Sequence, residues 1–163
     1  MSGHRETSTA APIDPDTAAL SPGPLHLRPV AIVAVALGGL IGAPARYGLG
    51  VAFPHTVGHW PVTTFAINMV GAFMLGGLLE ALARSGPDAG WRQGVRLCVG
   101  TGVIGSFTTY STLAVDTDLM LRGHHPRAAI TYALGSVVAG VVATTAGIAV
   151  GAWLTSQRGE EPK

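Results

Sequence analysis

Four long apolar runs separated by short polar segments dominate the sequence. The runs cover approximately residues 30–53, 61–84, 94–121 and 127–153. Each is at least as long as the roughly 20 residues that a helix needs to cross a bilayer. The segments between them carry turn chemistry, such as the Ser-Gly-Pro-Asp sequence at 85–88. The pattern therefore predicts an all-α membrane protein with four transmembrane helices.

The third run departs from a simple membrane helix. Residues 100–113 hold three glycines and a series of hydroxyl side chains where leucines and valines would be expected. Backbone outside helical geometry is tolerated at membrane depth only where protein or a water-filled cavity satisfies its polar groups. We therefore predict that the third helix is broken and faces the interior of a bundle, as at many ion sites of membrane proteins.

The two ends of the chain are polar and flank a single transmembrane unit. Residues 1–29 are rich in Pro, Ser, Thr, Asp and Ala and predict a disordered N-terminal tail. Residues 156–163 predict a short solvated tail, which leaves residues 30–155 as the four-helix domain. A mild excess of arginine near the membrane on the side of the termini favours cytoplasmic termini; these arginines are Arg28, Arg84, Arg92, Arg96 and Arg158.

Composition excludes several functional classes. Of the 163 residues, 48% are hydrophobic and only 12% are charged, and the formal net charge of +1 gives no basic surface for nucleic acid. The single cysteine, Cys98, excludes a disulfide framework or a cysteine metal cluster. No set of nucleophile, base and acid is visible, and the histidines lie in tails and loops, where solvated surface is expected. The Gly-x-Gly-x-x-Gly sequence at 100–105 lacks the strand-turn-helix context of a dinucleotide site. We therefore expect no enzyme activity.

Small residues spaced four apart predict close helix packing. Gly38 with Gly42, and Gly39 with Ala43, form one such face on the first helix. The fourth helix carries a longer ridge of Gly135, Ala139, Ala143, Gly147 and Gly151.

Two polar residues inside the spans each allow two interpretations. Arg46 either snorkels to the interface or caps backbone carbonyls, or it contacts a permeant anion directly. Asn68 shares a helix face with Thr64, and its carboxamide either joins two helices or binds a ligand.

Neutral hydrogen-bond donors recur through the second, third and fourth runs. Such groups can bind a small anion without the opposite charge that would trap it, as conduction requires. Carbonyls released at a helix break could in turn hold a monovalent cation. The donors are Thr64, Asn68, Thr108, Thr109, Ser111, Thr112, Tyr132 and Ser136.

Three motifs in order resemble the CrcB/Fluc family of fluoride channels over nearly all four runs. The motifs are Gly38-Gly39-x-x-Gly42-Ala43-x-x-Arg46-Tyr47, Thr64-x-x-x-Asn68-x-x-Gly71-x-Phe73 and Thr101-Gly102-x-x-Gly105-x-x-Thr108-Thr109-Tyr110-Ser111-Thr112. The resemblance implies a multi-pass protein of the cell membrane that exports cytoplasmic fluoride passively. It also implies an antiparallel, dual-topology dimer in the lipid bilayer, with two pores and a central sodium ion that is not transported.

The resemblance assigns roles to individual residues. The backbone oxygens that bind sodium in the family fall on Gly105 and Thr108, and Arg46 takes a structural role. The pore asparagine falls on Asn68. The remaining fluoride path is expected along Thr64, Tyr110, Ser111, Thr112, Leu113, Tyr132 and Ser136.

Departures from the family pattern leave the identity of the partner open. Tyr110 and Leu113 stand where the family has two pore-lining phenylalanines, and Leu113 has no ring edge to offer an anion. Asp116 stands where the family often has glutamate. With the biased arginines, these changes fit a heterodimer with a second family subunit as well as a homodimer. The alternatives are a non-conducting partner subunit and a proton-coupled exporter, which would need a carboxylate deep in a span.

Overall fold

The computed structural model describes residues 28–55 and 60–157, and these form seven helical segments with no strand among them. Residues 1–27 and 158–163 of the predicted tails, His59 and Arg158 lie outside this description. In chain order the segments are α2 (Pro29–Ala52), α3 (Val62–Ser85), α4 (Trp91–Val95), the π-helix η2 (Arg96–Ile104), α5 (Gly105–Phe107), α6 (Tyr110–Arg122) and α7 (Pro126–Gln157).

Three of these helices, α2, α3 and α7, are long and apolar enough to cross a membrane. Their bounds follow the predicted first, second and fourth runs closely, although α7 continues to Gln157. Pro44 lies inside α2 without ending it. The predicted all-helical class and three of the four predicted membrane-length helices are confirmed.

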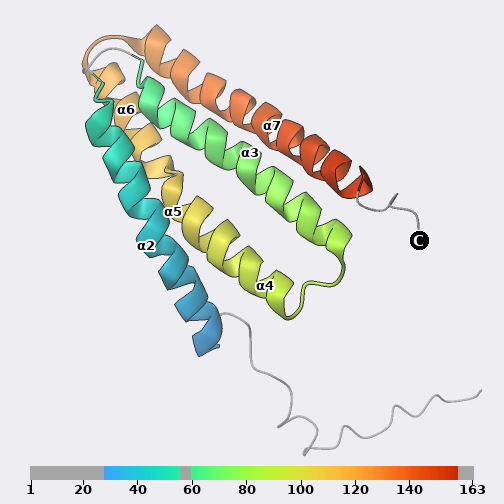
Figure 1. The fold of residues 1–163 in the computed structure, drawn as a ribbon. Coiled ribbons are helices and arrows are strands. Elements are labelled where there is room, and N and C mark those ends of the chain that lie inside the picture. Colours follow the sequence, from blue (N-terminus) through green and yellow to red (C-terminus); the bar gives the residue numbers. More distant parts are fainter. Residues whose placement is uncertain (1–27, 56–59, 158–163) are drawn as a thin grey trace, which may run out of the picture.

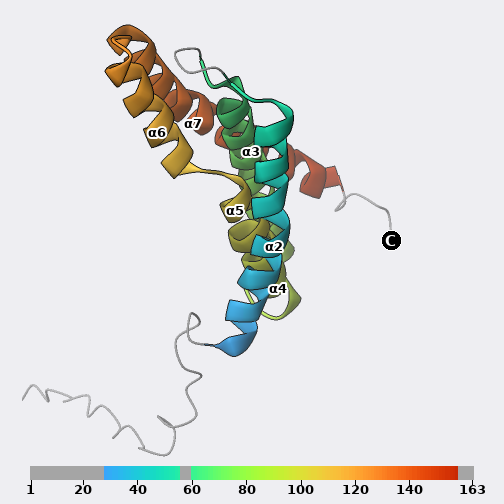
Figure 2. The same ribbon diagram turned by 90° about the vertical axis from the view of Figure 1, so that its left-hand side faces the viewer.

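The third run forms a series of shorter segments. Residues 91–107 are helical through α4, η2 and α5, and the three glycines of the run remain within this helical part. Thr108 (φ −76°, ψ 159°) and Thr109 (φ −148°, ψ 121°) are extended, and helical geometry resumes at Tyr110. Figure 2 shows this link, beyond which α6 runs along α7. The departure from helical geometry therefore falls on two threonines, not on the glycines.

The helices pack mainly as two pairs, α3 with α7 and α2 with η2 (Figure 1). In the second pair, a Cβ atom on Gly38 or Gly42 would overlap the backbone of η2, and one on Gly102 would overlap α2. Gly39 faces open space, with no described atom within 4 Å of an added Cβ. Only the Gly38–Gly42 half of the predicted small-residue face therefore makes the close contact.

The other pair uses the far end of the predicted ridge on α7. A Cβ atom on Gly147 would overlap the Phe73 carbonyl, and one on Gly151 would lie 2.6 Å from the Gly77 carbonyl oxygen. The backbones of α3 and α7 therefore approach each other closely at these glycines. This contact positions the rest of α7, including Tyr132 and Ser136, relative to α3.

The subunit buries few large side chains. Its small core consists of Met120, Ala129 and Tyr132, with Phe65 and Leu113 packed against it. Many large apolar side chains on the outer faces are exposed, for example Leu40 at 71% and Val137 at 62%. Such faces are suited to lipid or to another protein chain.

Candidate functional site: a groove beside the interrupted helix

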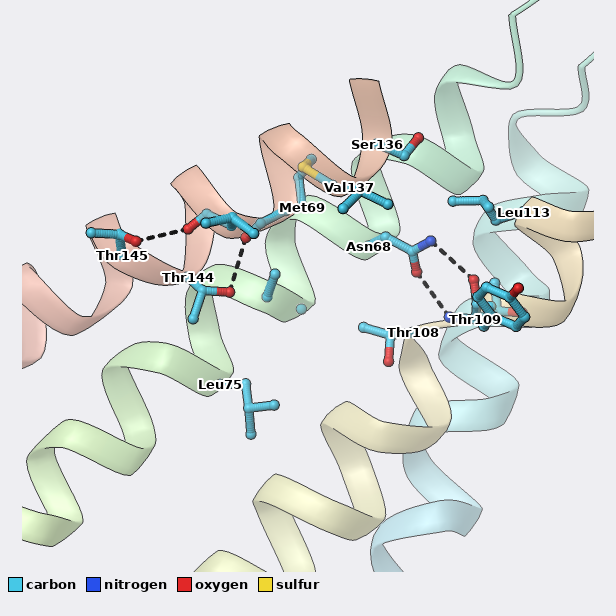
Figure 3. A pocket seen from close by; sticks show the side chains of 15 residues that line it. Asn68, Met69, Leu75, Thr108, Thr109, Leu113, Ser136, Val137, Thr144 and Thr145 are labelled. Atoms are coloured by element: carbon cyan, nitrogen blue, oxygen red, sulfur yellow. Dashed lines mark hydrogen bonds between the residues drawn. The ribbon is translucent and has the colours of Figure 1, made fainter. Parts of the chain in front are cut away.

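An open groove of about 550 Å³ lies between α3, α7 and the link that joins α5 to α6. Its polar lining comes from all three elements, and Figure 3 shows Asn68, Thr109 and Ser136 around it. Of the residues predicted to line a path, the groove lining contains Asn68, Tyr110, Leu113 and Ser136, but not Thr64, Ser111, Thr112 or Tyr132.

The two extended residues between α5 and α6, Thr108 and Thr109, form the interruption of the third helix. Asn68 holds this interruption in place by a pair of hydrogen bonds. Its Oδ1 accepts the Thr109 backbone N–H at 2.8 Å, and its Nδ2 donates to the Thr109 carbonyl oxygen at 3.0 Å (Figure 3). The carboxamide therefore replaces the Gly105 carbonyl as the partner of the Thr109 N–H, and it adds a second donor to the Thr109 carbonyl, which as the N-cap already accepts the first hydrogen bond of α6. One Nδ2 hydrogen is left over from this pairing, since a carboxamide carries two. The geometry combines the two interpretations of Asn68: it joins two helices and retains one donor.

Thr109 caps the helix that follows. Its Oγ1 accepts the Thr112 backbone N–H at 3.1 Å, as a threonine N-cap does. The same oxygen lies 3.1 Å from Ser111 Oγ and 3.0 Å from Thr112 Oγ1. Ser111 and Thr112 thus belong to a hydroxyl cluster around the cap, outside the groove lining. The spacing Thr109-x-x-Thr112 is a helix-start signal that could have located the interruption from the sequence.

The carbonyl groups that the interruption releases from the helical hydrogen-bond pattern include those of Gly105 and Thr108. In a continuous α-helix, the Gly105 carbonyl would accept the Thr109 N–H, and the Thr108 carbonyl would accept the Thr112 N–H. Here those two N–H groups bond to Asn68 Oδ1 and Thr109 Oγ1 instead. Gly105 and Thr108 are also the two residues that the family resemblance assigns to sodium. Neutral backbone oxygens suit a hard monovalent cation, so the residues present fit such an ion.

Arg46 lies against the same segment from α2. Its Nε donates to the Ser106 carbonyl oxygen at 3.1 Å, and the Ser106 hydroxyl donates to the Gly102 carbonyl at 2.7 Å. In a continuous helix the Ser106 carbonyl would accept the N–H of Tyr110, but here α6 only begins at Tyr110. Arg46 therefore places a cationic donor on a third carbonyl at the interruption, in line with the carbonyl-capping interpretation.

Two hydroxyls of α7 are buried without any hydrogen bond. Tyr132 is fully buried and Ser136 is 4% exposed, yet neither Tyr132 Oη nor Ser136 Oγ finds a partner in the described part of the chain. The Tyr132 ring meets Trp60 edge-on at 5.5 Å between centroids. Thr64 on α3 is 5% exposed and lies beside the Tyr132 hydroxyl. Buried polar groups are normally paired, so these hydroxyls call for a water or a ligand.

The two residues at the family's phenylalanine positions differ in placement. The Tyr110 side chain is 82% exposed at the groove. Leu113 lines the groove and also packs against the core cluster of Met120, Ala129 and Tyr132. The Tyr110 ring can therefore contact another molecule, whereas Leu113 also contributes to the packing of the chain itself.

One interaction was missed entirely by the sequence analysis. His55, from the connection between α2 and α3, places its Nε2 3.2 Å from Oδ1 of Asp116 on α6. The Asp116 side chain is only 4% exposed, and the His55 side chain is 31% exposed. His55 lies in a loop and is exposed, as expected for the histidines, but its contact with Asp116 was not predicted. The two residues are 61 positions apart, and no motif links them.

Among the described residues, no group of three or more His, Cys, Asp or Glu side chains could hold a metal ion.

Comparison with known proteins identifies the family. Residues 33–148 match the family described as "CrcB-like protein, Camphor Resistance (CrcB)". The chain is 48% identical to "Fluoride-specific ion channel FluC 2" of Leifsonia xyli subsp. xyli over 136 residues, which are 83% of this chain and 93% of that protein. It is 44% identical to "Fluoride-specific ion channel FluC 3" of Streptomyces avermitilis, over 82% of this chain and 64% of that protein. It is also 44% identical to "Fluoride-specific ion channel FluC 1" of Cutibacterium acnes, over 76% of this chain and 87% of that protein.

These relatives are named as ion channels and not as enzymes, in agreement with the class expected from the sequence. The apolar helices and the relatives together make the chain a multi-pass membrane protein. The match over most of its length shows that the chain belongs to the CrcB-like family.

Proposed function

We propose that this chain is a fluoride-specific ion channel that lets fluoride leave the cell passively across the cell membrane. The relatives that carry this name align with most of the chain. The observation that carries the proposal is the pair of buried, unpartnered hydroxyls of Tyr132 and Ser136 in the described part of α7. They lie one helical turn apart, so an anion can pass from one donor to the next.

The path would replace the water around fluoride with neutral donors. The free Nδ2 hydrogen of Asn68 and the Ser136 hydroxyl both line the groove, and the Tyr132 hydroxyl lies one turn before Ser136 on α7. Neutral donors bind a strongly hydrated anion without holding it too tightly, which is the balance that conduction requires.

The third membrane crossing would be made by the series from α4 to α6. The extended threonines lie at membrane depth in this arrangement and need protein cover. Asn68, Arg46 and the Thr109 hydroxyl supply part of that cover within the subunit.

A second subunit would complete the path. The groove is open on one side, and its rim carries exposed apolar side chains, including Val137, Val141 and Tyr110. We propose an antiparallel dimer, in which the partner covers this rim and the released carbonyls of Gly105 and Thr108 meet their counterparts. A sodium ion held there would supply a positive charge that joins the subunits without being transported.

Fluoride efflux from vesicles tests the proposal. Vesicles that contain the purified chain, alone and together with a second family subunit, are loaded with fluoride, and release is followed with a fluoride electrode. Release with the chain alone indicates a homodimer, and release only with the second subunit indicates a heterodimer. Chloride-loaded vesicles are the control for specificity. Vesicles that retain fluoride in both settings would refute the proposal.

One observation favours a proton-coupled exporter as the second candidate. Such a protein needs a carboxylate inside a span. Glu80 and Asp118 do not meet this need, because each pairs with an exposed arginine four residues on. Asp116 does, since it is 5% exposed. Release driven by a proton gradient, and lost in Asp116→Asn, would support this alternative.

A further inference from the structure

A buried carboxylate lies beside the proposed anion path. Asp116 Oδ1 contacts His55 Nε2 at 3.2 Å, whereas Asp116 Oδ2 is buried without a hydrogen-bond partner among the described residues. The Tyr132 hydroxyl lies next to this carboxylate and to the Thr64 hydroxyl. A carboxyl group thus lies beside the Tyr132 hydroxyl, which the proposed path uses as a donor.

This arrangement is unfavourable for anion passage unless the charge is compensated. A bare carboxylate repels an approaching anion, and it also competes for the hydrogen of the Tyr132 hydroxyl. In the described part of the chain, the side chain that can bring a positive charge to Asp116 is His55, because an imidazole is cationic when it is protonated. Its 31% exposure gives protons access to the ring.

We propose that His55 is a positioning residue for the anion path, which holds the Asp116 carboxylate and, when protonated, cancels its charge so that the Tyr132 hydroxyl can donate to fluoride. This inference rests on the proposed fluoride channel function. The other groups around the pair are consistent with it. Tyr132 is the titratable group of α7 that lies beside Asp116, α3 contributes the neutral Thr64, and Asp118 on α6 is paired with Arg122.

The inference predicts a pH profile that a merely structural contact would not produce. Fluoride efflux is measured with equal pH on both sides of the vesicle, from pH ~6 to ~8, a range in which imidazoles lose their charge and ordinary carboxylates do not. Protein-free vesicles give the leak of hydrogen fluoride, which is subtracted. We expect the rate to fall by roughly fivefold as the pH rises, because the carboxylate charge is no longer cancelled.

Variants show whether the pH dependence comes from His55 and Asp116 or from another histidine. His55→Gln keeps a donor but no charge, so its rate should be flat and close to the wild-type rate at high pH. Asp116→Asn should be flat and close to the wild-type rate at low pH, and adding His55→Gln to it should change nothing further. The matched control is His124→Asn, which removes an exposed imidazole from a turn position with φ +61° that asparagine tolerates. This variant should keep the wild-type profile.

The outcomes are distinguishable from failure of the proposed function. A wild-type rate that does not change with pH, or a changing rate that survives in Asp116→Asn, would overturn the role of His55 while leaving the channel function intact. Vesicles that release no fluoride at any pH would refute the channel function and this inference together.

Discussion

Replacing Asn68 with leucine, a side chain of similar shape, removes both hydrogen bonds to Thr109 and leaves the Thr109 backbone N–H without a partner. Side-chain hydrogen bonds in membrane proteins contribute on average about 0.6 and at most about 1.7 kcal/mol each. The backbone N–H left unpaired and partly buried adds about 1–3 kcal/mol. We therefore expect the free energy of unfolding to fall by roughly 2–4 kcal/mol.

Equilibrium unfolding in mixed micelles measures this change. The matched control is Thr131→Val, which removes an exposed hydroxyl whose bonds are to carbonyls of its own helix. The control should stay within about 0.5 kcal/mol of the wild type. If Asn68→Leu unfolds like the control, Asn68 does not hold the interruption and this role is refuted, even if fluoride flux is lost.

Three further predictions concern packing, the path and sodium. Gly42→Ala should destabilise the subunit by about 1–3 kcal/mol through overpacking against η2, whereas Gly39→Ala, which faces open space, should not; thermal unfolding compares them directly. Tyr132→Phe should lower fluoride efflux at least tenfold with little loss of stability, because its hydroxyl has no partner in the described fold; equal flux would exclude this donor from the path. Exchanging sodium for a large organic cation should weaken the dimer held at Gly105 and Thr108, and a dimer fraction independent of sodium, measured by cross-linking, would contradict the proposed ion site.

Much of the fold could be predicted because its signals are local. Span length and apolar composition located α2, α3 and α7 to within a few residues, apart from the extra turn at the end of α7. The small-residue spacing marked real contacts at Gly38 and Gly42, but spacing alone could not choose between that face and the one carrying Gly39. Which of the two faces makes the contact depends on where η2 packs against α2, and this is decided by the tertiary structure.

The site was less accessible from the sequence. Residues 100–113 were recognised as unusual, but their composition did not show which of them leave helical geometry. Gly102 serves close packing against α2, and the extended backbone falls on Thr108 and Thr109, where Asn68 and the Thr109 hydroxyl provide replacement partners. The contact between His55 and Asp116 joins distant parts of the chain. No periodicity or motif encodes such a contact.

Passive conduction is the central claim, and the reversal potential in a planar bilayer tests it most directly. A fluoride channel predicts a reversal potential that shifts by about 59 mV for each tenfold fluoride gradient and does not move when a pH gradient is imposed. A reversal potential that follows the pH gradient, or that ignores the fluoride gradient, would contradict the account.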